Sequence, residues 1–370
     1  SSTYVELQVI RWLLEIMGFP ASGGGILVSG GTMANFIGLA AARDAQADFD
    51  VWSEGLQSDS GRPRLTFYGS EATHGWAPKT ANVLGLGVDS FRKVPTTNER
   101  IDVPVLREFI ERDRAAGHQP FCVIGTAGSV NTGACDDLAA LADLCESERL
   151  WFHVDGAFGA WARLSSTHAD LVRGLDRADS LAFDLHKWGY LPFESACALV
   201  RSLDAMRRPF AIQGAYIAGS DRGTIGAGIP FADRSIELTR SFKALKVWMS
   251  LRAHGLDHLA ALIDQNLAQA RELVRLVEES PQLELVAPCP LNVVCFRYVT
   301  RDRSDGDLNA INTELLLRLQ ESGFVVPSST TIDGRFALRA AITNHRTRWH
   351  DLAQITELVV TLGREIESSS

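Results

Sequence analysis

The stretch SLAFDLHKWGY, Ser180 to Tyr190, places a lysine directly after a short apolar run. Lysine is strongly hydrated and is rarely buried without a partner. Alone, Lys187 would be interpreted as a surface lysine whose stem covers apolar neighbours. Its position after a predicted buried strand favours a functional amine if the rest of the chain supplies the other groups of a site.

A second stretch, LVSGGTMAN, carries groups that suit an anion. A predicted strand runs into Gly30 and Gly31, and Thr32 then opens a helix. Free N–H groups, the positive end of the helix dipole and a hydroxyl converge there, which suits a phosphate. The plainer alternative is a glycine turn with Thr32 as the helix cap. The spacing matches neither the P-loop nor the dinucleotide fingerprint.

Two aspartates and two histidines follow other predicted strands. Asp155 ends LWFHVD and Asp184 ends SLAFD, and α/β proteins present ligand-binding groups at such strand ends. A carboxylate there needs a cationic or hydrogen-bonding partner, although aspartates also cap helices. His74, in YGSEATHGWAPK, could stack on a ring, and His186 could contact a phosphate or orient its loop.

One ligand accounts for these groups together. An anion site, an aspartate for a protonated ring nitrogen and an amine for a Schiff base are what pyridoxal 5'-phosphate requires. The sequence therefore predicts a pyridoxal phosphate site that includes Gly31, Thr32, Asp155 and Lys187.

The elements that must position these groups alternate along the chain. Between residues 24 and 201, short β-type runs such as GILV, FCVIG and SLAFD alternate with longer helical runs. This pattern is typical of a mostly parallel sheet covered on both faces. We expect a large α/β domain over residues 1–274, with a mobile glycine-rich loop at about 210–232. A helical stretch that breaks near Gly255 leads into a small α+β domain over residues 275–370.

Composition and charge narrow the function classes. The 370 residues carry a net charge of -9 and no basic run, which argues against a nucleic-acid partner. No apolar run approaches the roughly 18 to 20 residues that span a bilayer, and SSTYVELQVI does not resemble a secretory signal. The six cysteines have neither zinc nor disulfide-framework spacing, so we expect no metal and a reducing, cytoplasmic environment.

Six segments resemble one family in order and spacing. SGGTMAN, GSEATHGWAPKTA, RAAGHQPFCVIGTAGSVNTGACDDL, LWFHVDGAFG, FDLHKW and RSFKALKVWMSLRAHG look like the group II pyridoxal-phosphate-dependent amino acid decarboxylases, which include aromatic-L-amino-acid, histidine, glutamate and diaminobutyrate enzymes. The resemblance extends from about residue 3 to about residue 350. It implies a fold of type I, similar to aspartate aminotransferase, a homodimer, and removal of the α-carboxylate of an L-amino acid as CO2 to leave the amine.

The resemblance also implies a role for each matching residue. Lys187 would bind the cofactor as a Schiff base, Asp155 would pair with the pyridine nitrogen, and His74 would stack on the ring. The remaining cofactor-binding positions are Gly31, Thr32, Ser129 and His186 at the phosphate, Ala157 against the ring, and Asp184.

Three features depart from the family. Asp184 stands where members commonly have asparagine, so a second acid alters the charge of the site. The family's N-terminal segment, which helps to cover the site across a dimer interface, is not in this sequence, and we expect residues upstream of Ser1. In the mobile loop, Phe231 aligns with a tyrosine that donates a proton in decarboxylases, although Tyr216 lies in the same loop.

Several alternatives stay open. Phenylalanine at the loop position is associated in this family with decarboxylation coupled to oxidative deamination, which gives an aldehyde. An aminotransferase or lyase of the same fold would also need Lys187 and Asp155, and Arg339 could then hold a substrate carboxylate. A non-enzymatic alternative is an inactive cofactor-binding partner subunit. The sequence does not identify the amino acid substrate.

Overall fold

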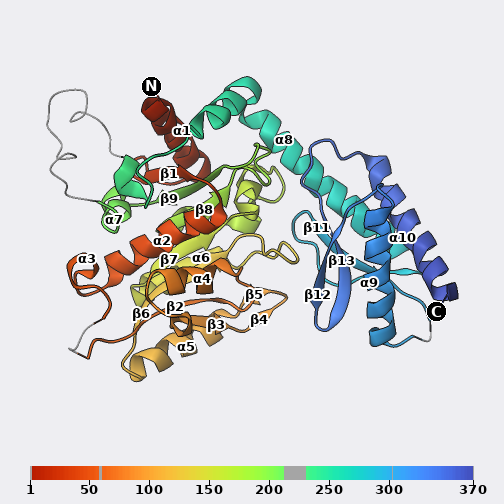
Figure 1. Ribbon diagram of the computed structural model, residues 1–370, viewed down its shortest axis with the longest axis horizontal. Helices are drawn as coiled ribbons and strands as arrows, with labels where there is room; N and C mark the ends of the chain where they lie inside the picture. The colour runs from red at the N-terminus through yellow and green to blue at the C-terminus, as the bar shows by residue number, and fades with distance from the viewer. Residues whose placement is uncertain (1, 58–60, 212–230, 302, 370) are drawn as a thin grey trace.

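A seven-stranded mixed sheet organises the larger part of the molecule (Figure 1), whose computed structural model describes residues 2–57, 61–211, 231–301 and 303–369. The strand order is β1 (Gly24–Val28), β9 (Ala196–Val200), β8 (Ser180–Asp184), β7 (Trp151–Asp155), β6 (Gln119–Thr126), β2 (Leu65–Ser70) and β3 (Phe91–Val94). Neighbours from β8 to β3 are parallel, and β9 is antiparallel to both β8 and β1. The mostly parallel sheet is confirmed.

Helices cover this sheet on both faces, since every residue of β1, β2, β7, β8 and β9 is buried. They are α1 (Ser2–Met17), α2 (Gly31–Gln46), α3 (Val51–Glu54), α4 (Trp76–Val83), α5 (Val103–Ala115), α6 (Leu138–Glu148) and α7 (Leu203–Arg207). Asp102 and Asp137 cap α5 and α6 by accepting hydrogen bonds from backbone N–H groups of the first turn. Within the described residues, no helix combines the length and apolarity that crossing a membrane requires.

A four-stranded antiparallel sheet forms the C-terminal part, in the order β10 (Leu283–Leu285), β11 (Val293–Tyr298), β13 (Arg335–Ala341) and β12 (Ser328–Ile332). Helices α9 (Asp305–Glu321) and α10 (Trp349–Ser369) cover the face of this sheet that is turned away from the large sheet (Figure 1). A short hairpin, β4 (Thr96–Thr97) and β5 (Arg100–Ile101), belongs to the large part.

The long helix α8 (Ala244–Glu279) joins the two parts (Figure 1). Gly255 interrupts it with φ 77°, a left-handed conformation that glycine tolerates, so the expected break is confirmed. The expected domain boundary between residues 274 and 275 falls inside this helix, and the domain division stays a prediction.

Phe231 marks the described end of the glycine-rich loop. Most of that loop, including Tyr216, lies outside the described residues. Phe231 is buried, and the guanidinium carbons of Arg234 and Arg240 lie 4.3 and 5.1 Å from its ring centroid. The contacts with these two cations fix the ring where the chain returns to α8.

A buried ion pair holds α1 and the segment before α8 to the edge strand β1. The carboxylate of Glu6 accepts hydrogen bonds from the Leu27 N–H at 3.1 Å and from Arg240 Nη1 at 3.0 Å. Arg240 also donates to the Leu27 carbonyl at 2.7 Å. The side chains of Glu6 and Arg240 are only 7% and 10% exposed, so water cannot replace a lost partner.

Replacing Glu6 with alanine is expected to lower the free energy of unfolding by about 3–5 kcal/mol, because Arg240 would be left buried without its counter-charge. Urea unfolding followed by circular dichroism measures this loss. The matched control is Glu272→Ala, which breaks the exposed pair of Glu272 with Arg275 and is expected to leave the free energy of unfolding nearly unchanged. Equal losses in the two variants would contradict the assigned role of Glu6.

Candidate active site

The carboxyl ends of five strands meet at one edge of the large sheet. Because β1 and β8 are both antiparallel to β9, β1 runs in the same direction as β8, β7, β6 and β2. Asp155 and Asp184 are the last residues of β7 and β8. At the same edge β1 leads into α2, and β2 leads into the loop that carries His74. This is the edge at which α/β sheets bind ligands.

A cavity of about 890 Å³ lies at this edge. It is lined by all nine residues that the sequence suggests for the site: Gly31, Thr32, His74, Ser129, Asp155, Ala157, Asp184, His186 and Lys187. Arg339 of β13 lines it from the C-terminal part, whereas Phe231 does not line it. The fold therefore brings the predicted residues together, and their individual roles stay predictions.

Lys187 is held by Asp184. Its Nζ lies 2.6 Å from Asp184 Oδ2, and its side chain is 43% exposed toward the cavity, whereas that of Asp184 is 1% exposed. His186 Nε2 lies 3.8 Å from the second oxygen, Oδ1. The other ring nitrogen of His186 lies 2.7 Å from the Ser195 carbonyl oxygen, which orients the imidazole. The amine is thus presented to the cavity by a buried carboxylate.

The first turn of α2 approaches the ends of β7 and β8 closely. A Cβ atom on Gly31 would lie 3.0 Å from Asp184 Oδ2 and 3.2 Å from the Ala157 Cβ atom, so a larger residue would not fit. The preceding residue, Gly30, supplies no side-chain cap. Within the described chain the N–H groups of Gly31 and Thr32 donate to no acceptor, which leaves two donors at the positive end of the helix.

Asp155 is anchored through both of its oxygens. The Trp76 indole N–H donates to Oδ2 at 2.6 Å, and the Ala157 N–H donates to Oδ1 at 3.1 Å. The residue is 6% exposed, and each oxygen retains a lone pair for a ligand. Trp76 is the first residue of α4 and comes two residues after His74. It was not expected at the site, because no sequence pattern indicates which carboxylate an indole N–H will reach.

His74 lies on the exposed part of the cavity wall, just before α4. Its Nδ1 accepts a hydrogen bond from the Trp76 N–H at 3.3 Å. This hydrogen bond connects His74, whose ring is predicted to stack on a ligand, to Trp76, whose indole holds Asp155.

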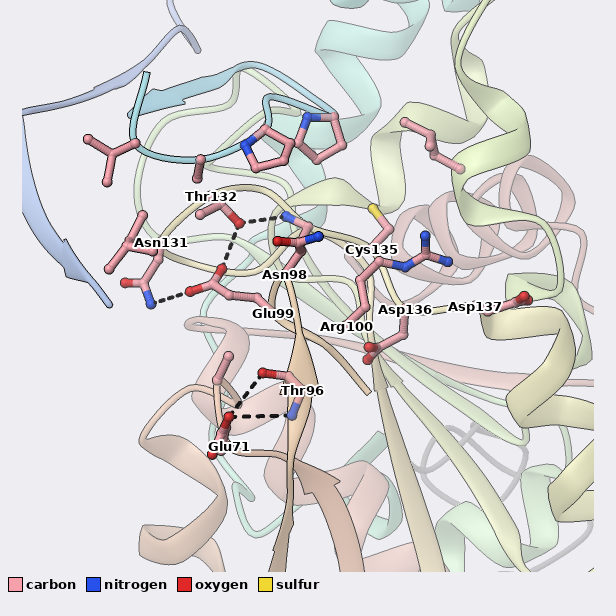
Figure 2. Close-up of a pocket in the computed structure, with 18 of the residues that line it drawn as sticks. Glu71, Thr96, Asn98, Glu99, Arg100, Asn131, Thr132, Cys135, Asp136 and Asp137 are labelled. Carbon is pink, nitrogen blue, oxygen red and sulfur yellow. Dashed lines mark hydrogen bonds between the residues drawn. The ribbon is translucent and has the colours of Figure 1, made fainter. Parts of the chain in front are cut away.

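The Ser129 hydroxyl is turned toward a neighbouring pocket. It donates to Glu99 Oε2 at 2.6 Å. Figure 2 shows Glu99 between Asn131 and Thr132, which donate to it at 2.7 and 2.6 Å, in a pocket of about 680 Å³. Although Ser129 lines the cavity, its hydroxyl is engaged by Glu99, and its backbone N–H donates to the Ala134 carbonyl at 2.8 Å. In this arrangement Ser129 has no free donor for a phosphate, so its predicted role there stays a prediction.

A buried histidine supports the floor of the site from within the sheet. His153 Nδ1 lies 2.7 Å from the Ser180 hydroxyl and Nε2 lies 2.8 Å from Asn35 Oδ1. This orients Asn35, which lines the cavity and whose Nδ2 is buried without a partner among the described atoms. Burial lowers the pKa of His153 from 6.5 to about 4, so the ring is neutral at physiological pH.

The chain matches a known family over most of its length. The pyridoxal-dependent decarboxylase conserved domain matches residues 1–299. The chain belongs to the pyridoxal-dependent decarboxylase family. It is 35% identical to an aromatic-L-amino-acid decarboxylase of Bacillus atrophaeus, over 99% of this chain and 74% of that protein.

Two further proteins resemble this decarboxylase. It is 29% identical to a phenylacetaldehyde synthase of Arabidopsis thaliana, over 92% of this chain and 70% of that protein. A crystal structure of Oryza sativa TDC with PLP and tryptamine superposes with a TM-score of 0.89 at 26% identity, over 99% and 76% of the two chains. The fold is therefore that of type I pyridoxal phosphate enzymes, and the protein is a pyridoxal phosphate-dependent carboxy-lyase that decarboxylates an amino acid.

The cavity of this decarboxylase fits its cofactor. Three buried polar atoms on the cavity-lining residues have no partner among the described atoms: Asn35 Nδ2, Thr126 Oγ1 and Asp184 Oδ1. Each unpaired buried group costs about 1–3 kcal/mol, so a polar ligand would relieve several at once. Lys187, Asp155 and the open N–H groups of α2 are the residues suited to hold the cofactor's aldehyde, ring nitrogen and phosphate.

Acid is expected to destabilise this decarboxylase through His153. Its folded pKa of about 4 lies below the unfolded value of 6.5, so its stabilising contribution is complete above pH 6.5 and is lost as pH falls toward 4. The loss amounts to about 3 kcal/mol. Urea unfolding at pH 7 and at pH 4.5 measures this loss of unfolding free energy. The control is His153→Gln, whose side chain can still donate a hydrogen bond to Asn35 but does not titrate. The variant should lose less stability on acidification, and an equal loss would contradict the prediction.

Proposed function

We propose that Lys187 holds pyridoxal phosphate covalently and that Asp155 keeps its ring nitrogen protonated. The observation that carries the proposal is the convergence of the nine residues named above on one cavity, with the Lys187 amine exposed toward it. When bound, the cofactor supplies an electron sink for the electron pair that remains when a carboxylate leaves as CO2.

The residues of this chain would position the reacting groups. Asp155 is buried and fixed by Trp76 and Ala157, so its negative charge would retain a proton at the ring nitrogen. His74 would cover one face of the ring. Arg339 lines the cavity and has no acidic partner within the described residues, so its guanidinium could bind the substrate carboxylate and orient it.

The proposed substrate is an aromatic L-amino acid. Support comes from the name of the relative that is 35% identical and from Phe158 and Phe193, which give the cavity aromatic walls. The test is release of CO2 from a panel of aromatic, acidic and diamino L-amino acids by the enzyme loaded with cofactor. A kcat/KM at least about tenfold higher for an aromatic member supports the proposal. Preference for an acidic or diamino member would overturn it.

A second candidate function is aldehyde formation. Phe231 in the place of the loop tyrosine and the 29% identity to a phenylacetaldehyde synthase favour it. That reaction consumes one O2 and one water per amino acid and releases CO2, ammonia, H2O2 and the aldehyde, whereas simple decarboxylation releases only CO2 and the amine. We propose the simple reaction, for which amine should equal CO2 with no oxygen uptake. Equimolar H2O2 would establish the alternative.

We also propose a homodimer in a reducing, cytoplasmic compartment. Large apolar side chains on α1, on α8 and on the segment before it are exposed: Tyr4, Ile236, Leu238 and Met249. Such a concentration of exposed apolar side chains is typical of an interface. All six cysteines are free, which supports the compartment. Light scattering after size-exclusion chromatography tests the dimer, for which the expected mass is twice the 40.4 kDa of one chain.

A further inference from the structure

Asp184 lies against the first residue of α2. Its two oxygens lie 3.0 and 3.4 Å from the position of a Cβ atom on Gly31, so the carboxylate is next to the helix N-terminus, where the N–H groups of Gly31 and Thr32 donate to no acceptor in the described chain. It is 1% exposed, and Oδ1 has no hydrogen-bond partner in the described chain. A buried carboxylate survives there because positive groups surround it.

The charged and titratable groups that face Asp184 come from two elements. Lys187 and His186, on the turn after β8, lie 2.6 and 3.8 Å from its oxygens. The N-terminus of α2 adds a partial positive charge from the other side. Asp155, at the end of β7, is the other acid that lines the cavity, and it is held separately by Trp76. Without a ligand, the Asp184 carboxylate is therefore balanced mainly by the Lys187 ammonium.

Cofactor binding changes this balance, if the proposed function is correct. Condensation of the Lys187 ammonium with the aldehyde forms a C=N bond, releases water, and leaves one hydrogen and the positive charge on the nitrogen. This step therefore leaves the positive charge in place. A phosphate group bound at the start of α2 adds a charge of about -1.5 to -2 near the carboxylate. Neighbouring anions raise each other's pKa, so keeping both fully ionised costs free energy.

We propose that Asp184 takes up one proton from solvent when pyridoxal phosphate binds, and that the resulting carboxylic acid donates a hydrogen bond to the phosphate. A protonated carboxyl has one O–H donor, which a hydrogen bond to the phosphate requires, and the amide of an asparagine at this position would also have a donor. Cofactor affinity then depends on pH through this residue. Because binding takes up one additional proton, the affinity falls about tenfold for each unit by which the pH rises.

The experiment compares the wild-type apoenzyme with Asp184→Asn from about pH 6 to pH 8.5. The dissociation constant of pyridoxal phosphate is followed by quenching of tryptophan fluorescence. The wild-type dependence is expected to be steeper by about tenfold per pH unit, and the variant should bind at least about tenfold more tightly at the highest pH. Asp264→Asn removes a carboxylate that is bound by Ser165 and Ser166 outside the cavity, and it should behave as the wild type does.

Two further measurements isolate the phosphate and the proton. Pyridoxal has no phosphate, so wild type and Asp184→Asn should show the same pH dependence for it. In weakly buffered solution, binding of pyridoxal phosphate should take up about one proton more in the wild type than in the variant. The 31P resonance of the cofactor bound to wild type should report a dianion throughout, because the carboxyl holds the proton.

The outcomes separate this inference from the proposed function. Equal pH dependences in wild type and Asp184→Asn, or a bound monoanionic phosphate in the wild type, would overturn the proton uptake. Borohydride reduction followed by peptide mass spectrometry should find the cofactor on Lys187 in both proteins. Label at another residue would overturn the proposed function itself, whatever the proton measurements give.

Discussion

Replacing Lys187 with alanine is expected to abolish covalent retention of the cofactor and to lower kcat by at least about 10³-fold, because no other amine can take its position. Among the described residues that line the cavity, Lys187 is the one lysine. Visible absorption before and after borohydride reduction measures retention, and CO2 release measures turnover. The matched control is Lys79→Ala on α4, an exposed lysine outside the cavity, which should retain both properties.

The same substitution should also destabilise the apoenzyme. Asp184 would lose the ammonium at 2.6 Å, and because the Lys187 side chain is 43% exposed, water in the cavity would replace part of the interaction. The expected cost is about 1–3 kcal/mol. The double variant Lys187→Ala with Asp184→Asn should recover most of this stability without recovering activity, which separates the structural part of the effect from the chemical part. Turnover by Lys187→Ala within tenfold of wild type would contradict the assignment.

Replacing Asp155 with asparagine is expected to lower kcat by about 10²- to 10⁴-fold. Asparagine keeps an oxygen for one of the two N–H groups that hold the residue, but it carries no charge to retain a proton on the ring nitrogen. A buried ion pair broken on one side costs about 3–5 kcal/mol, which corresponds to this change in rate. Steady-state kinetics with saturating cofactor measures it.

Trp76→Phe is the matched control for Asp155→Asn, because it removes the 2.6 Å hydrogen bond while leaving the carboxylate charged. One hydrogen bond to a charged group contributes roughly 1.5–3 kcal/mol, so a loss of about 10- to 150-fold in kcat is expected. An asparagine variant that is no slower than the phenylalanine variant would show that the charge of Asp155 is not what matters.

The sequence predicts the backbone of the site well, because the backbone follows from local patterns. Buried strands ending in Asp155 and Asp184, and a strand entering a helix at Gly31, are signals contained within about ten residues each. In a parallel sheet such ends share an edge, so their convergence could be expected before any side chain was placed.

The sequence does not predict which side chains pair with one another. The hydrogen bonds from Trp76 to Asp155 and between His153 and Asn35 join residues 79 and 118 positions apart. Only tertiary packing decides which donor reaches which acceptor, and no local preference records it. For the same reason the turn of the Ser129 hydroxyl toward Glu99 could not be foreseen, since Glu99 belongs to a separate hairpin.

The second half of the kinked helix α8 is shared by the two parts of the molecule. From Gly255 to its end at Glu279 it extends about 36 Å, at the usual rise of 1.5 Å per residue. Its residues Leu259, Ile263 and Leu267 are buried in the core of the large part, and Ala270, Leu273 and Val277 are buried in the core of the C-terminal part. One continuous helix is therefore anchored in both cores. The C-terminal sheet, which brings Arg339 to the cavity, is thereby held in a fixed position relative to the strand ends of the large sheet.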